Sequence, residues 1–186
     1  MKHAVKMTLV LSLALASVNA QDAVKMTFSG NGGPSPIDLK QPNAITGEES
    51  VAGNGTLGPF TFRDIRAAAT SPQPSSTCSG VFFPNVYGGG ILRFQDGSLL
   101  RVNLKQGADS GDCIDFVHLM AHCTLTFEIK GGTGRFQDAS GVLTYAETAT
   151  PVLFDLLGNV VLGTETGEIT GTISGVGREG EQEQRQ

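Results

Sequence analysis

The sequence CTLTFEIKGGTGRFQDASG, residues 123–141, decides the fold class of this chain. In its first eight residues the apolar Leu125, Phe127 and Ile129 alternate with polar residues. A period of two places each set of side chains on its own face of a β-strand. The glycines that follow allow the positive φ angles of a turn, and Gly141 begins another β-like run. The segment therefore predicts two strands joined by a glycine-rich turn.

The same pattern recurs on both sides of this segment. The pair Asp96-Gly97 separates the β-like runs 86–94 and 98–105, which predicts a hairpin with a tight turn. The run 114–121 is ambiguous, and the glycines and prolines of 30–41 predict a loop. Further strands are expected at 23–29, 50–56, 60–69, 141–148 and 160–174.

These runs amount to roughly eight strands, a number at which an antiparallel sheet can close into a barrel. The composition agrees, because Gly accounts for 25 of 186 residues, nearly twice the usual share of about 7%. Trp is absent, so the ten Phe residues must supply most of the aromatic core. We predict an all-β chain that forms a single, roughly eight-stranded antiparallel β-barrel.

The N-terminal 20 residues have the three parts of a signal peptide. Lys2 and Lys6 supply positive charge, the run 7–16 is apolar, and Val18-Asn19-Ala20 suits signal peptidase. The alternative, an uncleaved anchor, needs about 20 apolar residues to span a bilayer, and this run is shorter. We expect residues 1–20 to be the signal peptide, 21–177 the barrel domain and 178–186 a disordered polar tail. The expected location is therefore secreted or periplasmic.

The charge of the exported chain limits its partners. Removing Lys2 and Lys6 from the 13 basic residues leaves 11, against 18 acidic residues, a formal charge of −7. A nucleic-acid partner needs a basic surface that neutralises phosphates, so none is expected. No later segment is apolar enough to predict a membrane span, and no cofactor is expected either.

Three cysteines, Cys78, Cys113 and Cys123, predict one disulfide and one leftover thiol in an oxidising compartment. The sequence alone does not fix the pairing. We expect Cys113–Cys123, because that bond closes a short loop beside a strong strand. A nucleophilic Cys123 would need an activating base, but the adjacent His122 would point to the opposite face of a strand.

Asp115, His118 and His122 form the candidate metal site. The two histidines have the i, i+4 spacing that places both imidazoles on one face of a helix, where Asp115 would join them. On a strand they would lie about 13 Å apart, too far for one ion. The alternative interpretation is a loop or strand whose histidines have ordinary hydrogen-bond partners.

The candidate catalytic residues are Glu128, Glu147 and Tyr145, and Glu165 and Glu168 also lie on predicted strands. A carboxyl group inside an apolar barrel has a raised pKa and can exchange protons near neutral pH. The alternative is that the glutamates face water and that Tyr145 belongs to the core. The phase of Glu128, opposite to Phe127 and Ile129, favours water for that residue.

The turn after residue 129 also carries a family resemblance. Its residues Gly131, Gly132, Thr133, Gly134 and Phe136 resemble the signature of the allene oxide cyclase and dirigent group, and the strand 167–175 is similar to the closing strand of that barrel. The resemblance implies an eight-stranded, calycin-like barrel that is often trimeric. It implies that these five residues build a structural turn, and it assigns no catalytic residue.

Three functions follow as expectations. The first is a barrel that binds a small apolar or phenolic molecule in its cavity. The second is a cofactor-free isomerase or cyclase of the allene oxide cyclase type, which a buried ionisable group in the cavity would favour. The third is a structural envelope protein whose barrel is filled by side chains and has no ligand-sized void. A metallohydrolase depends on the candidate metal site.

Overall fold

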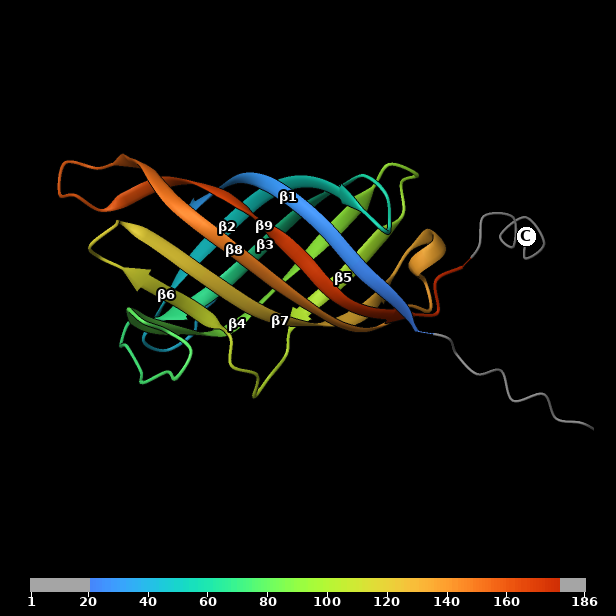
Figure 1. Ribbon diagram of the computed structural model, residues 1–186, viewed down its shortest axis with the longest axis horizontal. Coiled ribbons are helices and arrows are strands. Elements are labelled where there is room, and N and C mark those ends of the chain that lie inside the picture. The colour runs from blue at the N-terminus through green and yellow to red at the C-terminus, as the bar shows by residue number, and fades with distance from the viewer. Residues whose placement is uncertain (1–20, 178–186) are drawn as a thin grey trace, which may run out of the picture.

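The computed structural model describes residues 21–177, and the expected signal peptide and polar tail lie outside the described residues. Nine strands and one short 3₁₀ helix, η1 (Gly134–Phe136), make up this part of the chain (Figure 1). None of the helices described between residues 21 and 177 is long and apolar enough to cross a membrane. The strands are β1 (Asp22–Pro34), β2 (Ala44–Gly55), β3 (Phe60–Ala69), β4 (Val81–Phe94), β5 (Leu99–Leu104), β6 (Gly111–Asp115), β7 (Met120–Gly132), β8 (Ser140–Phe154) and β9 (Val160–Ser174).

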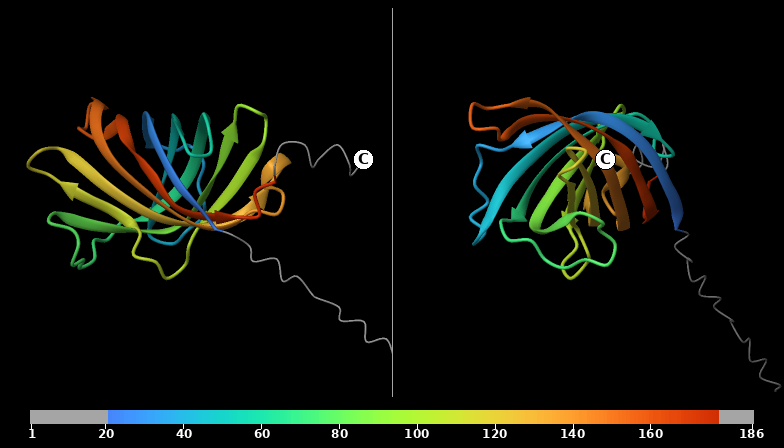
Figure 2. Two further views of the ribbon diagram at one scale, coloured as in Figure 1. Left: turned by 45° about the vertical axis from the view of Figure 1, so that its right-hand side comes forward. Right: turned by 60° about the vertical axis from the view of Figure 1, so that its left-hand side comes forward.

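Eight of these strands close into a barrel in which every neighbour is antiparallel. The order around the ring is β1, β2, β3, β4, β5, β7, β8 and β9, and β9 pairs with β1. The remaining strand, β6, pairs with β4 and β7 beyond the end of the short β5. Figure 2 shows the strands curving around a common interior. The predicted all-β fold and single eight-stranded barrel are confirmed.

The loop predicted for residues 30–41 is only partly correct, because β1 continues to Pro34. Gly32 and Gly33 pair with Glu49 and Glu48 of β2, where the sequence predicted a loop. A Cβ atom at Gly32 would collide with the side chains of Glu165 and Glu49. Glycine here therefore leaves room for two inward-facing carboxyl groups and does not end the strand.

Aromatic side chains fill the barrel from its middle to the end near η1. The ring of Phe28 stacks on Tyr145 with 4.5 Å between centroids, and Phe62 lies 5.7 Å from the same ring. Phe136 of η1 is fully buried and packs on Phe94 at 4.7 Å. The barrel is thus closed at this end by its own side chains.

The glycine-rich turn carries Phe136 into that position. Gly131 and Gly134 have φ angles of 74° and 58°, a region that disfavours residues with a Cβ. The hydroxyl of Thr133 accepts a hydrogen bond from the amide of Leu99 at 3.2 Å, which joins the turn to β5. The turn residues therefore have structural positions at the closed end.

The predicted disulfide pairing is wrong, because Cys113 is bonded to Cys78 and Cys123 is a buried free thiol. The register between β6 and β7 explains the error. Cys113 lies opposite His122, whereas Cys123 lies opposite Asp112. The two cysteines are therefore one residue out of phase, so their side chains point to opposite faces of the sheet.

Candidate functional site

The inner face of the barrel changes from apolar to ionisable along its length. On β8 the inward series runs through Leu143 and Tyr145 to Glu147, and on β9 it runs in the opposite direction from Ile169 to Glu165. Because β8 and β9 are antiparallel neighbours, both acidic residues reach the end of the barrel that lies away from η1. The period of two that builds the core therefore also places carboxyl groups inside the barrel.

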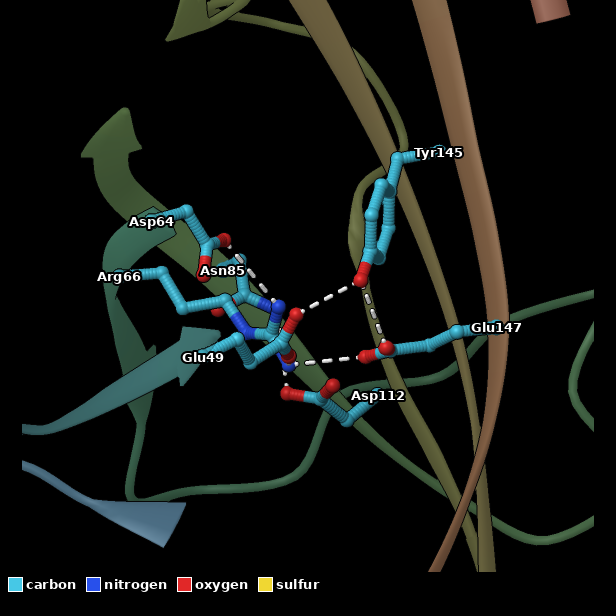
Figure 3. Close-up of polar contacts among 7 residues, drawn as sticks. All are labelled: Glu49, Asp64, Arg66, Asn85, Asp112, Tyr145 and Glu147. Carbon is cyan, nitrogen blue, oxygen red and sulfur yellow. Dashed lines mark hydrogen bonds and ion pairs between the residues drawn. The ribbon is translucent and has the colours of Figure 1, made fainter. Parts of the chain in front are cut away.

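Arg66 of β3 lies among the acidic side chains of Glu49, Asp64, Asp112 and Glu147 (Figure 3). Its Nη2 atom is 3.0 Å from Glu147 Oε1 and also contacts Glu49 Oε1, and its Nη1 atom lies 3.4 Å from Asp64 Oδ2. Burial alone would lower the pKa of Arg66, but the charges of Asp112 and Glu147 raise it by more, so the guanidinium stays charged. Three carboxyl groups thus share one buried cation.

The hydroxyl of Tyr145 joins two of the same carboxyl groups. It lies 2.9 Å from Glu49 Oε2 and 3.0 Å from Glu147 Oε2. A phenol has one proton, so it donates to only one of them, and the second hydrogen bond requires a proton on the other carboxyl group. Burial raises the pKa of Glu147 and of Tyr145, which favours the protonated forms. Glu49, Tyr145 and Glu147 therefore form a chain in which protons are shared.

The Oε2 atom of Glu165 is buried and has no hydrogen-bond partner among the described residues, as is also true of Asp64 Oδ1. Glu165 differs from Glu49, Asp64 and Glu147 because those three contact Arg66 and Glu165 does not. The side chain belongs to a residue that is only 4% exposed. Burial, with a further contribution from the charge of Glu147, raises the pKa of Glu165 to about 8. Glu165 can therefore gain or lose a proton near neutral pH.

Glu49, Glu147 and Glu165 place carboxylate oxygens within 4.8 Å of one another, a spacing at which three carboxylates could hold a metal ion. Arg66 already contacts two of the three, Glu49 and Glu147. An ion at this position would compete with the guanidinium for the same oxygens. The resident cation of the cluster is therefore Arg66.

Asp112 of β6 and Cys123 of β7 lie beside these residues. Together with Glu49, Asp64, Arg66, Tyr145, Glu147 and Glu165 they form what we call the polar floor. Burial raises the pKa of the Cys123 thiol well above its ordinary value, and the charge of Asp112 raises it further. A thiol in this state is a poor nucleophile, because the thiolate is the reactive form. Asp112 accepts a hydrogen bond of 3.0 Å from the Asn85 amide, which fixes its carboxylate.

A cavity of about 730 Å³ lies above this floor, at the end of the barrel opposite to η1. Its upper wall is formed by the turn between β6 and β7, by the β8–β9 hairpin and by the start of β2. In Figure 1 this hairpin projects at the end away from η1. The apolar side chains around the opening belong to Ile45, Ala68, Ile114, Phe116, Leu119, Met120, Ala149, Pro151, Phe154 and Val160.

Two of the predicted catalytic candidates, Tyr145 and Glu147, lie in the polar floor, and so does Glu165. Glu128 lies elsewhere: it is exposed and forms an ion pair of 2.7 Å with Lys130, which lowers its pKa. Glu168 is exposed as well. Glu128 and Glu168 therefore do not belong to the site.

The predicted metal ligands do not converge. His118 lies in the exposed turn between β6 and β7, where its Nδ1 atom is 2.7 Å from Asp115. His122 is on β7, and its Nδ1 atom contacts Thr148 Oγ1 at 3.1 Å. The hydrogen bond with Asp115 raises the pKa of His118. The structure thus brings together Asp115 and His118 but places His122 with a different partner.

Sequence reasoning missed Glu49, Asp64 and Arg66. A signal for the last two was present, because Phe60 and Phe62 set an inward phase that Asp64 and Arg66 continue. Charged residues in the apolar phase of a strand indicate a buried polar site. Glu49 precedes the inward-facing Val51 by two residues and therefore shares its face of the strand. The strand predicted from the sequence starts at Ser50 and therefore leaves Glu49 out.

No protein-family model matches this chain, and no curated protein sequence matches it. The resemblance to the allene oxide cyclase and dirigent group therefore rests on the turn at residues 129–141 and on the similarity of strand 167–175. The function has to be argued from the site itself.

Proposed function

We propose that this chain is an exported barrel that binds a small molecule with an apolar body and a polar end. The observation that carries this proposal is the cavity, whose apolar opening leads to an ionisable floor. Ligand sites in proteins typically occupy about 300–1,000 Å³ and combine apolar walls with a few polar groups, and this cavity falls in that range. The Cys78–Cys113 disulfide fits an oxidising compartment outside the cytoplasm.

The cavity argues against a purely structural barrel. A barrel filled by its own side chains would have no void of ligand size, as its closed end demonstrates. At the open end, buried carboxyl groups stand where apolar residues would have been less costly. Such groups are retained at a cost in stability when a ligand uses them.

A second function, cofactor-free isomerisation or cyclisation, is favoured by the unpartnered carboxyl group of Glu165. As a carboxylate, Glu165 would take a proton from one atom of the substrate and, as the resulting acid, return it to another. The composition of the substrate is then unchanged. The proton-sharing chain of Glu49, Tyr145 and Glu147 would adjust the charge around Glu165 during the transfer. This activity agrees with the family resemblance.

Native mass spectrometry of the protein purified from its exporting compartment tests the binding function. We expect extra mass of a few hundred daltons that is lost on denaturation, and the same spectrum reports whether the trimer implied by the resemblance forms. The matched control is Ala149→Trp, which fills the cavity opening and should abolish the extra mass. Equal bound mass in both proteins, or failure of small apolar probes to bind either, would contradict the proposal.

A further inference from the structure

The floor of the cavity contains far more acid than base. Five carboxyl groups surround it, but Arg66 is the single Lys or Arg among the described residues that line the cavity. Those of Glu49, Asp112, Glu147 and Glu165 line the cavity, and that of Asp64 contacts Arg66 without lining it. Even with some of them protonated, this balance favours a positive or neutral ligand end and repels an anion.

Arg66 is not free to bind an anionic ligand. Glu49, Asp64 and Glu147 contact its two terminal nitrogens from three sides. A ligand carboxylate would have to displace one of these partners, which would leave a buried carboxylate without a cation. Fatty-acid anions are therefore poor ligands for this site.

Glu165, in contrast, is not an ion-pair partner of Arg66. It lines the cavity, and its buried Oε2 atom lacks a donor within the described chain. Gly32 makes space for its other oxygen, because a Cβ atom at residue 32 would lie 2.1 Å from Glu165 Oε1. A buried acceptor without a donor is costly, so the donor is expected to come from the ligand.

We propose that Glu165 holds the ammonium group of a small aliphatic or aromatic amine whose apolar body lies against the cavity walls. This inference rests on the proposed binding function and names its ligand class. The ammonium donates a charge-assisted hydrogen bond to Glu165 and gains from the surplus of acid around it. The apolar opening, with Phe116, Leu119 and Phe154, receives the rest of the molecule.

An amine fits this floor better than a divalent metal ion. A metal would need several oxygens at once, and those of Glu49 and Glu147 are engaged by Arg66 and Tyr145. An ammonium group needs a single free carboxylate, which Glu165 supplies. The apolar walls would have no function in holding a bare ion.

The binding should depend on pH in a defined direction. Glu165 faces Glu147 of β8, Glu49 of β2, and Asp64 and Arg66 of β3, with Asp112 of β6 nearby. Because its pKa is raised to about 8, an ammonium ligand must first displace a proton at lower pH. Affinity should rise about tenfold for each pH unit up to 8, level off, and fall when the amine itself deprotonates above pH ~10.

A series of matched head groups tests the proposal. Dodecylammonium, dodecanol and dodecanoate would be titrated by calorimetry at pH 8.5, below their micelle concentrations. We expect dodecylammonium to bind most tightly and dodecanoate most weakly. Glu165→Gln should weaken dodecylammonium binding at least about tenfold and leave dodecanol within about twofold. Glu168→Gln, an exposed glutamate on the same strand, is the matched control and should change neither.

The outcomes separate the two proposals. Equal binding of all three compounds would overturn the amine inference and leave the binding function intact, whereas binding of none would overturn the binding function. Competition by Mg²⁺ or Ca²⁺ that Glu165→Gln abolishes would replace the amine with a metal site. If Glu165→Gln does not fold, the pH dependence of the unmodified protein decides, because a flat profile between pH 6 and 8 contradicts the inference.

Discussion

The two ends of this barrel follow the same strand alternation but have opposite interiors. At the closed end, Phe136 is fully buried and packs on Phe94, and the buried Phe62 and Leu125 continue this apolar core toward the middle of the barrel. At the open end, Arg66 and Glu165 occupy the equivalent inward positions below a cavity. The comparison teaches that one end supplies stability, which allows the other to retain the buried charge that the proposed ligand would use.

The largest expected effect is in the apolar core that continues from the closed end to the middle of the barrel. Phe62→Ala removes a ring that packs on Phe127 and Tyr145, with centroids 6.0 and 5.7 Å away. We expect a loss of about 4 kcal/mol in the free energy of unfolding, measured by urea denaturation. Phe154→Ala is the control at the cavity opening, where the ring is 45% exposed, and should cost less than about 1 kcal/mol. Equal losses would remove the distinction between the two ends.

Arg66→Met tests the open end and should cost about 3 kcal/mol at pH 8, because it leaves Glu49, Asp64 and Glu147 buried without their cation. The loss should shrink as pH falls. Without Arg66 the pKa of Glu147 rises further, so the carboxyl groups take up protons and become neutral. Urea denaturation at pH 5 and pH 8 measures both values. A loss that does not change with pH would mean that the guanidinium contributes through packing alone.

The closed end could be predicted from the sequence more completely than the open end. Alternation in residues 123–130 and the glycine turn that follows depend on local chemistry, and both lie on strands and turns as expected. The polar floor depends on which strands become neighbours. Glu49 and Tyr145 are 96 residues apart and form a hydrogen bond only because the barrel closes. No local pattern carries that information.

The cysteines and histidines illustrate the same limit in a second way. The Cys113–Cys123 hypothesis used loop length, but the pairing depends on the register of β6 against β7. A difference of one residue in this register places a side chain on the opposite face of the sheet. The spacing of His118 and His122 suits a helix, yet the chain turns between them into β7. The cysteine pairing is decided by a strand register and the histidine positions by a turn, and composition and spacing determine neither.

A smaller effect concerns the pH dependence of stability. The pKa of Glu165 is raised from about 4.5 when unfolded to about 8 when folded, so the native state keeps a proton that the unfolded chain releases in this window. Stability from this group is complete below pH ~4.5 and is lost as pH rises through 8. The free energy of unfolding, measured by urea denaturation, should therefore decline between pH 5 and 8.5. Glu165→Gln should make this decline smaller by about 1–2 kcal/mol, whereas Glu168→Gln should not change it. Identical declines in both variants would show that Glu165 is ionised in the folded protein.

The smallest effect should come from Leu119, in the turn at the cavity opening. Its φ of 51° is in the left-handed region, where a side chain costs about 1 kcal/mol, and the side chain is 58% exposed. Leu119→Gly should therefore stabilise the fold by about 0.5 kcal/mol, after the added freedom of the unfolded chain is counted. It should also weaken dodecylammonium binding, because Leu119 lines the cavity.

Lys40→Gly is the matched control for that substitution. Lys40 has a φ of 57° and is exposed, but it does not line the cavity. The same relief of strain should appear in urea denaturation, without any change in binding. If both variants are stabilised and only Leu119→Gly binds the amine more weakly, the strained leucine is explained by its contact with the ligand. If neither affects binding, the ligand does not contact Leu119, and its apolar body lies against the other walls of the cavity.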